Sequence, residues 1–186
     1  DRCLTCRNCE STCPSGVRYG RLVDIGRRLV DERVVRPVSQ RLTRWAMRET
    51  LSRRKVFGFL FGIARFVRPV LPATLKKKVQ VPHPAGVWPT NKSTRQMLLH
   101  EGCVQPAMMP NVDSATARVF DKLGIELIMA PSAECCGAIR QHLNDHHGAE
   151  AQMKRNIDAW WPYVEKGIDT IVINASGCGV MIKDYA

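Results

Sequence analysis

Apolar side chains in the first half of the chain recur at helical spacing. The pattern predicts a helix over about residues 19–30. Its apolar side is formed by Leu22, Ile25, Leu29 and Val30. Pro37 is expected to close this segment, because proline interrupts helical hydrogen bonding. Residues 38–68 keep the helical spacing and carry many basic side chains, which predicts one or two basic amphipathic helices. Residues 69–95 are rich in proline, including Pro82, and in lysine, so we expect a linker or extended segment.

From Met97 the pattern changes to short apolar runs that alternate with helical stretches. The expected order is strand, helix, strand, helix, strand, over residues 97–99, 111–123, 125–129, 148–165 and 168–173. Asn111 or Asp113 is expected to cap the first of these helices, and Gly124 and Gly167 are expected to end the two helices. This alternation is typical of a parallel sheet with helices on both faces.

A cysteine follows each of the three predicted strands. In open parallel sheets the carboxyl ends of the strands meet at one edge, where binding sites form. We therefore expect Cys103, Cys135, Cys136 and Cys178 to converge, although they lie far apart in the sequence. The alternative is that they are small buried core residues, as free cysteines often are. The flanking glycines favour a site, because they permit tight turns and close backbone approach; they are Gly102, Gly137, Gly177 and Gly179.

A second group of cysteines lies close together at the start of the chain. Cys3, Cys6, Cys9 and Cys13, with Pro14 after them, have the spacing of bacterial ferredoxin ligands, which predicts an iron–sulfur cluster. Zinc is the main alternative, but zinc sites usually pair two Cys-x2-Cys elements across a dozen or more residues. Disulfides would require an oxidising compartment, which nothing in the sequence indicates.

The cysteine run by itself leaves its clusters incomplete. Cys3, Cys6 and Cys9 need a fourth ligand, and in two-cluster ferredoxins the fourth cysteine of such a run binds the other cluster. Either Cys13 completes the same cluster, or a matching run lies upstream of Asp1. Because the chain begins so close to Cys3, we expect it to be a piece of a longer protein with the second run upstream.

Charge is concentrated away from both cysteine groups. The 186 residues include 28 Lys and Arg against 17 Asp and Glu, a formal net charge of +11. Residues 15–80 alone hold 17 basic and 4 acidic residues and no cysteine. The sequence pI of about 9.6 is typical of nucleic-acid binding, but aromatic residues make up only 6%. Because the basic window lacks an interleaved aromatic platform, we expect no nucleic-acid partner.

The basic window contains one strongly apolar run, residues 56–64. No apolar run in the chain reaches the roughly 18–20 residues of a membrane-spanning helix. Residues 56–64 instead suit either a helix at a lipid interface or a helix packed on a partner subunit.

The remaining candidate residues predict no substrate chemistry. The histidines His100, His142, His146 and His147 are expected to be solvated or hydrogen-bonded rather than metal ligands. Two of them, His142 and His146, would share one face if their stretch is helical. Trp160 and Trp161 are expected to end a helix before Pro162 and to pack in the core. The sequence contains no Ser/His/Asp triad, glycine-rich phosphate loop or flavin motif.

Five segments together resemble a known family. They are DRCLTCRNCESTCPSGVRY at 1–19, DIGR at 24–27, HEGCVQP at 100–106, ECCGA at 134–138 and NASGCG at 174–179. The first two resemble the second ferredoxin motif of the iron–sulfur subunits of bacterial glycolate oxidase (glycolate dehydrogenase). The other three resemble the cysteine-rich "CCG" domain of those subunits. The combination is far more specific than the ferredoxin run alone.

The resemblance implies a helix-rich α+β chain in three parts. Residues 1–37 would be a small helical ferredoxin-type 4Fe–4S segment, and residues 38–95 a basic helical linker. Residues 96–186 would be the first CCG domain, an α/β domain with a parallel sheet, truncated before its end. One or two 4Fe–4S clusters are implied. Their ligands are Cys3, Cys6, Cys9 and Cys13, and Cys103, Cys135, Cys136 and Cys178 are further candidates.

The resemblance also implies a function. Such subunits relay electrons from flavoprotein subunits, which hold FAD and oxidise glycolate to glyoxylate, towards quinone. The implied location is cytoplasmic, peripheral on the inner face of the membrane. Related subunits serve glycerol-3-phosphate and lactate dehydrogenases and heterodisulfide reductase, and a structural zinc scaffold is the alternative from a different class.

The second cysteine group departs from the CCG pattern of heterodisulfide reductase. The 31 residues between Cys103 and Cys135 fit that pattern, but the 41 between Cys136 and Cys178 exceed it. The last cysteine of the pattern falls on Met181, which cannot supply a thiolate. Two interpretations of the group therefore remain open: a cluster site, or a partial site with a structural or redox role.

Overall fold

A computed structural model describes residues 3, 5–81 and 83–185 of the chain. Asp1, Pro82 and Ala186, which enter the sequence interpretation, lie outside the described residues. The longer helices are α2 (Tyr19–Arg33), α3 (Val38–Leu51), α4 (Arg54–Phe66), α7 (Pro110–Lys122), α9 (His146–Val164) and α10 (Ser176–Lys183). The short helical segments are α1 (Asn8–Thr12), η1 (Arg68–Val70), α5 (Ala73–Lys76), α6 (Gln105–Met108) and α8 (Ala138–His142). The strands are β1 (Arg95–His100), β2 (Ile125–Ile128) and β3 (Ile171–Ile173).

The sheet has three parallel strands in the order β2-β1-β3. Leu98 and Leu99, adjacent in the central strand, point to opposite faces, and each is almost fully buried. Leu98 packs in a cluster with Trp160 of α9, and Leu99 packs in a second cluster with Ala117 of α7. The predicted parallel sheet with helices on both faces is therefore confirmed.

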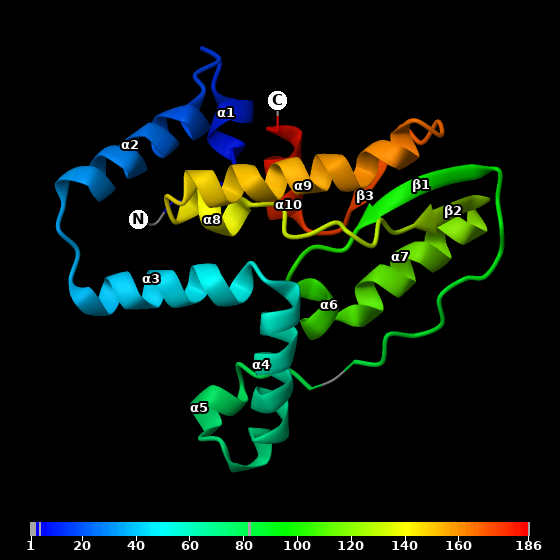
Figure 1. Cartoon of the computed structure of the whole chain (residues 1–186), viewed down its shortest axis with the longest axis horizontal. Helices are drawn as coiled ribbons and strands as arrows, with labels where there is room; N and C mark the ends of the chain where they lie inside the picture. Colours follow the sequence, from blue (N-terminus) through cyan, green and yellow to red (C-terminus); the bar gives the residue numbers. More distant parts are fainter. Residues whose placement is uncertain (1–2, 4, 82, 186) are drawn as a thin grey trace.

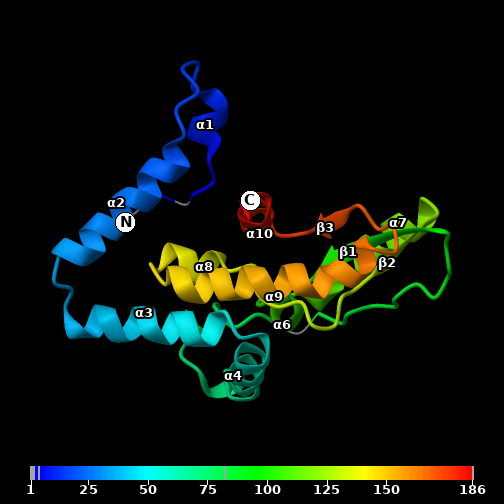
Figure 2. The ribbon, with the colours of Figure 1, turned by 45° about the horizontal axis from the view of Figure 1, so that its top comes forward.

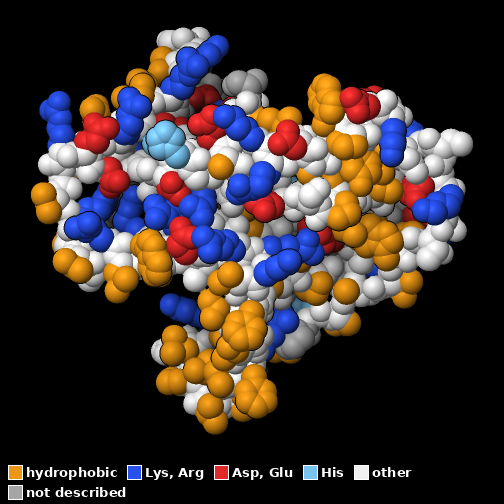
Figure 3. Space-filling model, in the orientation of Figure 1, with side chains coloured by type: hydrophobic (Ala, Val, Ile, Leu, Met, Phe, Trp, Pro, Cys, Tyr) orange, Lys and Arg blue, Asp and Glu red, His pale blue; other side chains and the backbone are white. Residues whose placement is uncertain are grey.

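The first half of the chain lies outside this sheet as a series of helices. The helix predicted near residues 19–30 is α2, and the basic stretch forms two helices, α3 and α4, as expected. Helix α4 and the short helix α5 project away from the sheet as an arm (Figures 1 and 2). Much of the arm's visible surface is hydrophobic (Figure 3). Within the described parts of the chain, no helix combines the length and apolar content needed to cross a bilayer.

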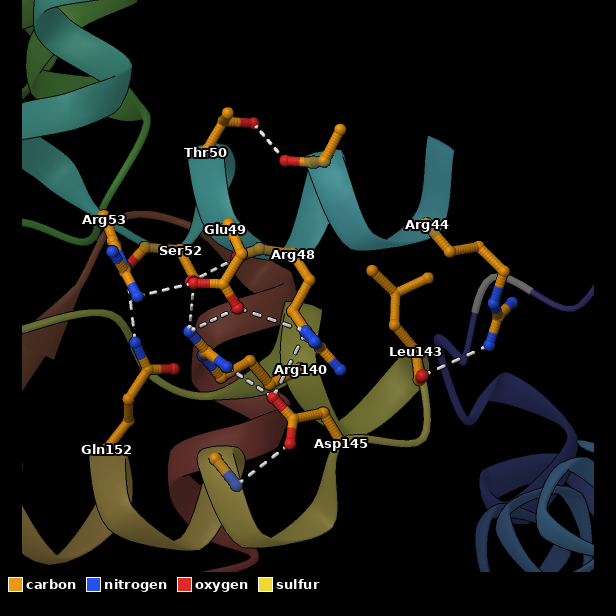
Figure 4. A network of polar contacts seen from close by, with 12 residues as sticks. Arg44, Arg48, Glu49, Thr50, Ser52, Arg53, Arg140, Leu143, Asp145 and Gln152 are labelled. Carbon is orange, nitrogen blue, oxygen red and sulfur yellow. Dashed lines mark hydrogen bonds and ion pairs between the residues drawn. The ribbon is translucent and has the colours of Figure 1, made fainter. Parts of the chain in front are cut away.

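A partly buried network of charges attaches α3 to α8 and α9 (Figure 4). The Arg140 guanidinium lies 3.3 Å from a carboxylate oxygen of Glu49 on α3 and also pairs with Asp145. Arg48 of α3 lies 3.5 Å from Asp145. Burial opposes the charge of Asp145, but the hydrogen bonds from Arg140 and the Gly148 N–H outweigh it, so the pKa of Asp145 lies below its ordinary value. Opposite charges thus fix the helical half of the chain to the α/β half.

Several local expectations prove wrong. Helix α7 begins at Pro110, whose missing N–H costs nothing at the first helical position, and no side chain caps it. Asp113, one of the two expected caps, lies inside the first turn with its carboxylate turned to neighbouring side chains. Helix α9 runs past Pro162 to Val164, because the helix loses only one hydrogen bond there and Tyr163 packs on the core.

The third correction concerns two of the histidines. His142 is the last residue of α8 and His146 is the first of α9, so they share no helical face. Between them Asn144 adopts a positive φ of 60°, which breaks the helix. Trp161, expected in the core, is exposed, and its indole N–H donates to Glu165, whereas Trp160 is buried as expected.

Candidate metal centre

The four cysteines that follow the strands come together at the carboxyl edge of the sheet. Cys103, Cys135 and Cys136 are buried, and Cys178 in the first turn of α10 is half-buried. The thiol of Cys135 contacts those of Cys103 and Cys136, and Cys136 also contacts Cys178. The convergence expected from the parallel topology is therefore present as a chain of thiol–thiol contacts.

Cys136 is the thiol in this group that ionises most readily. Contacts with the Cys135 and Cys178 thiols and the Ala138 N–H stabilise its thiolate and hold its pKa well below the ordinary range, despite burial. The same contacts raise the pKa values of Cys135 and Cys178. Thiolates are the form that binds metal, so the group presents at least one good ligand.

Two glycines allow these loops to approach one another. Gly102 has a φ of +73°, and a Cβ added there would lie 3.9 Å from the Cys178 sulfur. Gly137 has a φ of +86°, and a Cβ there would lie 3.1 Å from the backbone oxygen of Ala149. Both positions require the left-handed backbone and close contact that glycine accepts readily.

The loop that carries Cys135 and Cys136 is held by side chains that the sequence interpretation did not identify. Asn156 of α9 is completely buried; its Oδ1 accepts from the Glu134 N–H at 2.7 Å, and its Nδ2 donates to the Cys135 carbonyl at 3.0 Å. The Tyr185 hydroxyl donates to the Cys136 carbonyl at 2.8 Å. No sequence signal distinguished Asn156, because its role depends on which loop lies opposite α9.

The loop that leads to Cys178 is held from the other side of the sheet. The buried carboxylate of Asp113 accepts from Asn174 and Gln105, each at 2.8 Å. Asn174 also accepts from the Thr116 hydroxyl at 3.0 Å. Burial raises the pKa of Asp113 even though these two amides stabilise its charge. Asp113 therefore positions the β3–α10 turn instead of capping α7.

The arrangement of these thiols suits a polynuclear group better than a single ion. Among the described residues, no three His, Cys, Asp or Glu side chains surround one metal-ion position. A structural zinc ion needs four ligands at about 2.0–2.3 Å from one point. In an iron–sulfur cluster each thiolate would bind a separate iron atom, so the four thiols need no common focus.

The cysteines of the first group lie on the loop before α1, on α1 itself and directly after it. Cys3, Cys6 and Cys9 are exposed and Cys13 is half-buried, with Cys9 on the short helix α1. Between the cysteines, Thr5 and Arg7 adopt positive φ values of 56° and 57°. Such a conformation is rare for a β-branched residue and occurs mainly where function imposes it.

Backbone N–H groups face two of these sulfur atoms. The Thr5 N–H donates to the Cys3 sulfur at 3.4 Å. The N–H groups of Val17 and Ser15 stabilise the Cys13 thiolate and lower its pKa. Hydrogen bonds to sulfur are among the features that tune iron–sulfur clusters. The exposed thiols, the loop with positive φ values and these N–H donors are all compatible with a cluster. Among the described residues, no three side chains surround one metal-ion position.

An ion pair joins the two cysteine regions. Arg7, between Cys6 and Cys9, donates to Asp184 at the end of α10, the helix that carries Cys178. The hydrogen bond measures 2.6 Å, and it raises the pKa of Arg7. Beside it lies a cavity of about 460 Å³, whose lining includes Thr5, Arg7 and Met181.

The histidines differ from expectation at one position. The His142 ring lies 3.5 Å from the Arg27 guanidinium, His146 bonds to Gln141 at 2.9 Å, and His147 is exposed. His100, in contrast, is buried and has no hydrogen-bond partner among the described residues. The expectation of a solvated or hydrogen-bonded role is wrong for His100, because tertiary packing buries its ring against Trp160.

Comparisons with known proteins agree with this description. Residues 97–183 match a family model described as "Cysteine-rich domain" (CCG). The glycolate oxidase iron–sulfur subunit of Escherichia coli is 46% identical over 186 residues, which is all of this chain and 46% of that protein. A probable glycolate oxidase iron–sulfur subunit of Bacillus subtilis is 24% identical over 209 residues, covering 98% of this chain and 46% of the relative.

The comparisons also show how much of each relative this chain covers. It spans about half the length of the curated relatives it matches. No solved structure gives a significant match. Residues 97–183 thus match the model of a cysteine-rich (CCG) domain, in a chain that is similar along its whole length to the iron–sulfur subunits of glycolate oxidases.

Proposed function

We propose that this chain is the electron-relay part of a flavin-dependent 2-hydroxy-acid dehydrogenase. A 4Fe–4S cluster, when bound, accepts and releases single electrons. Cys3, Cys6 and Cys9 hold one such cluster, and Cys13 serves it or a neighbouring one. Cys103, Cys135, Cys136 and Cys178 form a second metal-binding group. Residues 1–37, 38–95 and 96–186 are the corresponding cluster segment, basic linker and CCG domain.

The observation that carries this proposal is the Arg7–Asp184 contact between two cysteine groups of different type. It supports a relay, because it joins the loop of the ferredoxin spacing to the helix that begins beside Cys178. The residues around each group bind and orient; none of them forms a nucleophile–base pair for substrate chemistry. Substrate oxidation is therefore assigned to FAD-containing partner subunits.

Glycolate is the proposed substrate of the assembled complex. The names of the two relatives support this choice over glycerol-3-phosphate, lactate or a heterodisulfide. In the complex, glycolate but not glycerol-3-phosphate should reduce the iron–sulfur centres within the turnover time. Reduction by glycerol-3-phosphate or lactate alone would assign the chain to one of the related dehydrogenases.

Anaerobic purification of the chain tests the cofactor directly. We expect a brown protein with about four iron and four sulfide per cluster and an EPR signal after reduction. Measurement of iron, sulfide and zinc on the same sample separates the two classes of function. A colourless protein with stoichiometric zinc and no iron would support the zinc scaffold and contradict the relay.

The arm that projects from the body is the proposed contact with the membrane. Its exposed apolar stripe follows one face of α4 at helical spacing: Val56, Phe59, Leu60, Ile63 and Phe66. Phe59 and Phe66 are 70% and 86% exposed. Residues 52–81 contain eight Lys or Arg and no Asp or Glu. Apolar side chains framed by basic ones favour an anionic lipid surface, which supports a peripheral location on the inner face of the membrane.

Vesicle co-sedimentation tests this contact. We expect binding to vesicles with anionic phosphatidylglycerol, weaker binding at high salt, and little binding to phosphatidylcholine alone. The double variant Phe59→Ser, Phe66→Ser should bind about tenfold or more weakly, because it removes two apolar insertions.

Matched substitutions on another helix provide the control. Val119→Ser with Leu123→Ser removes two exposed apolar side chains, one from α7 and one from the residue directly after it, away from the arm, and should leave vesicle binding unchanged. Failure of the unmodified chain to bind anionic vesicles would assign the stripe to a protein partner instead.

A further inference from the structure

His100 is the last residue of β1, lies three residues before Cys103, and is buried. Only 3% of the residue is exposed, and its ring meets Trp160 edge-on, with centroids 5.6 Å apart at 84°. Both ring nitrogens are buried and lack a hydrogen-bond partner among the described residues. Buried polar groups in proteins almost always have a partner, so this imidazole is missing one.

Three observations indicate where the missing partner lies. The His100 ring packs on Trp160, Trp160 stacks on Tyr185, and the Tyr185 hydroxyl donates to the Cys136 carbonyl at 2.8 Å, so one packed layer joins the ring to the Cys136 loop. Cys103 lies three residues farther along, after the turn at Gly102, which brings the chain against Cys178. A neutral imidazole keeps a free lone pair on one of its nitrogens, and neither buried nitrogen of His100 has another use among the described residues.

The cysteine group itself offers four thiols, and the position at which the CCG pattern has a fifth holds Met181. Met181 is buried and supplies no thiolate. A neutral imidazole is a common ligand for iron, and histidine replaces cysteine as a ligand in some iron–sulfur centres.

We propose that His100 is a nitrogen ligand of the metal group held by Cys103, Cys135, Cys136 and Cys178. This inference rests on the proposed function, because it requires those cysteines to bind an iron-containing group. When the group is bound, the four thiolates would hold it together with the free ring nitrogen of His100. The site then has four sulfur donors and one nitrogen donor from this chain.

The test isolates this group by removing the first one. A chain with Cys3→Ser, Cys6→Ser and Cys9→Ser is reconstituted anaerobically with iron and sulfide and reduced. Pulsed EPR should detect a nitrogen strongly coupled to the iron, and the coupling should change when histidine is labelled with 15N. Adding His100→Leu should abolish that coupling, whereas His142→Leu, a half-buried histidine paired with Arg27, should preserve it.

Stability of the metal-free chain separates a ligand from a structural residue. His100→Leu should leave the urea midpoint of the apo chain unchanged or higher, because it removes two unpaired buried nitrogens. A lowered midpoint would assign His100 a structural role and overturn the proposal. His100→Cys, which keeps a ligand at the position, should retain iron but lose the nitrogen coupling, and it gives the answer even if the leucine variant does not fold.

The remaining outcomes distinguish failure at each level. Iron bound without histidine coupling, or coupling that survives His100→Leu, overturns the ligand assignment. If the triple-serine chain binds no iron while the unmodified chain does, the inference about His100 fails and the relay function of the first group stands. Absence of iron from the unmodified chain overturns the proposed function itself.

Discussion

Replacing Cys9 with serine is expected to remove the iron held by the first cysteine group, about four atoms per chain, together with its EPR signal. Cys9 is an exposed residue of α1, directly after the loop that carries Cys3 and Cys6. The thiolate is the ligand form of cysteine, and a serine hydroxyl does not ionise in its place. Because Cys9 makes no core contact, the fold of residues 97–183 should survive.

Iron, sulfide and EPR measurements on Cys9→Ser and on a neighbouring variant check this expectation. Ser11→Ala changes the same helix and removes only a hydroxyl that donates to the Asn8 carbonyl at 2.9 Å. It should keep the iron content and the signal of the unmodified chain. Retention of both by Cys9→Ser would show that the ferredoxin spacing is not the cluster site.

Replacing Asn156 with alanine is expected to destabilise the α/β domain by about 3 kcal/mol. The side chain has no exposed surface, and it bonds to the Glu134 N–H, the Cys135 carbonyl and the Tyr185 hydroxyl. The substitution removes the partner of the Glu134 N–H and of the Cys135 carbonyl, and each buried polar group left unpaired costs about 1–3 kcal/mol. The loop that holds Cys135 and Cys136 therefore loses its anchor on α9.

Urea denaturation measures the effect of Asn156→Ala as a lower midpoint. With a slope of about 1–3 kcal/mol per molar urea, the shift should be about 1 M or more. Asn91→Ala is the matched control, because Asn91 is exposed and bonds only to Asp121, so its loss should cost less than about 0.5 kcal/mol. An Asn156→Ala midpoint equal to that of Asn91→Ala would contradict the assigned anchoring role.

Much of the fold could be predicted because hydrophobic period reflects which face of an element is buried. The alternation after Met97 predicted the three strands with α7 and α9 between them. The stripe from Leu22 to Val30 predicted α2 by its helical period alone, since these side chains are exposed in the structure. The predicted end of a helix was wrong where tertiary contacts determine how far the helix continues. Pro162 did not end α9, because packing of Tyr163 on the core outweighs one lost hydrogen bond.

The candidate site could be predicted from the sequence about as far as the fold could. The position of cysteines after parallel strands predicted that Cys103, Cys135, Cys136 and Cys178 meet, since parallel strands carry their carboxyl ends to one edge. The signal at His100 was also present, directly after an apolar run and three residues before Cys103. It could not be interpreted, because the burial of a side chain depends on elements that are remote in sequence.

The sequence by itself determined the chemistry of this protein: two groups of four cysteines, their spacing, a parallel sheet to gather one group, and a basic segment separate from both. These features follow from residue type and local period. Only the tertiary structure decided that Cys136 lies between Cys135 and Cys178, that Asn156 and Asp113 hold the cysteine loops, and that His100 is left without a partner. Such contacts join residues tens of positions apart, and their energies depend on burial and distance, which exist only once the chain has packed.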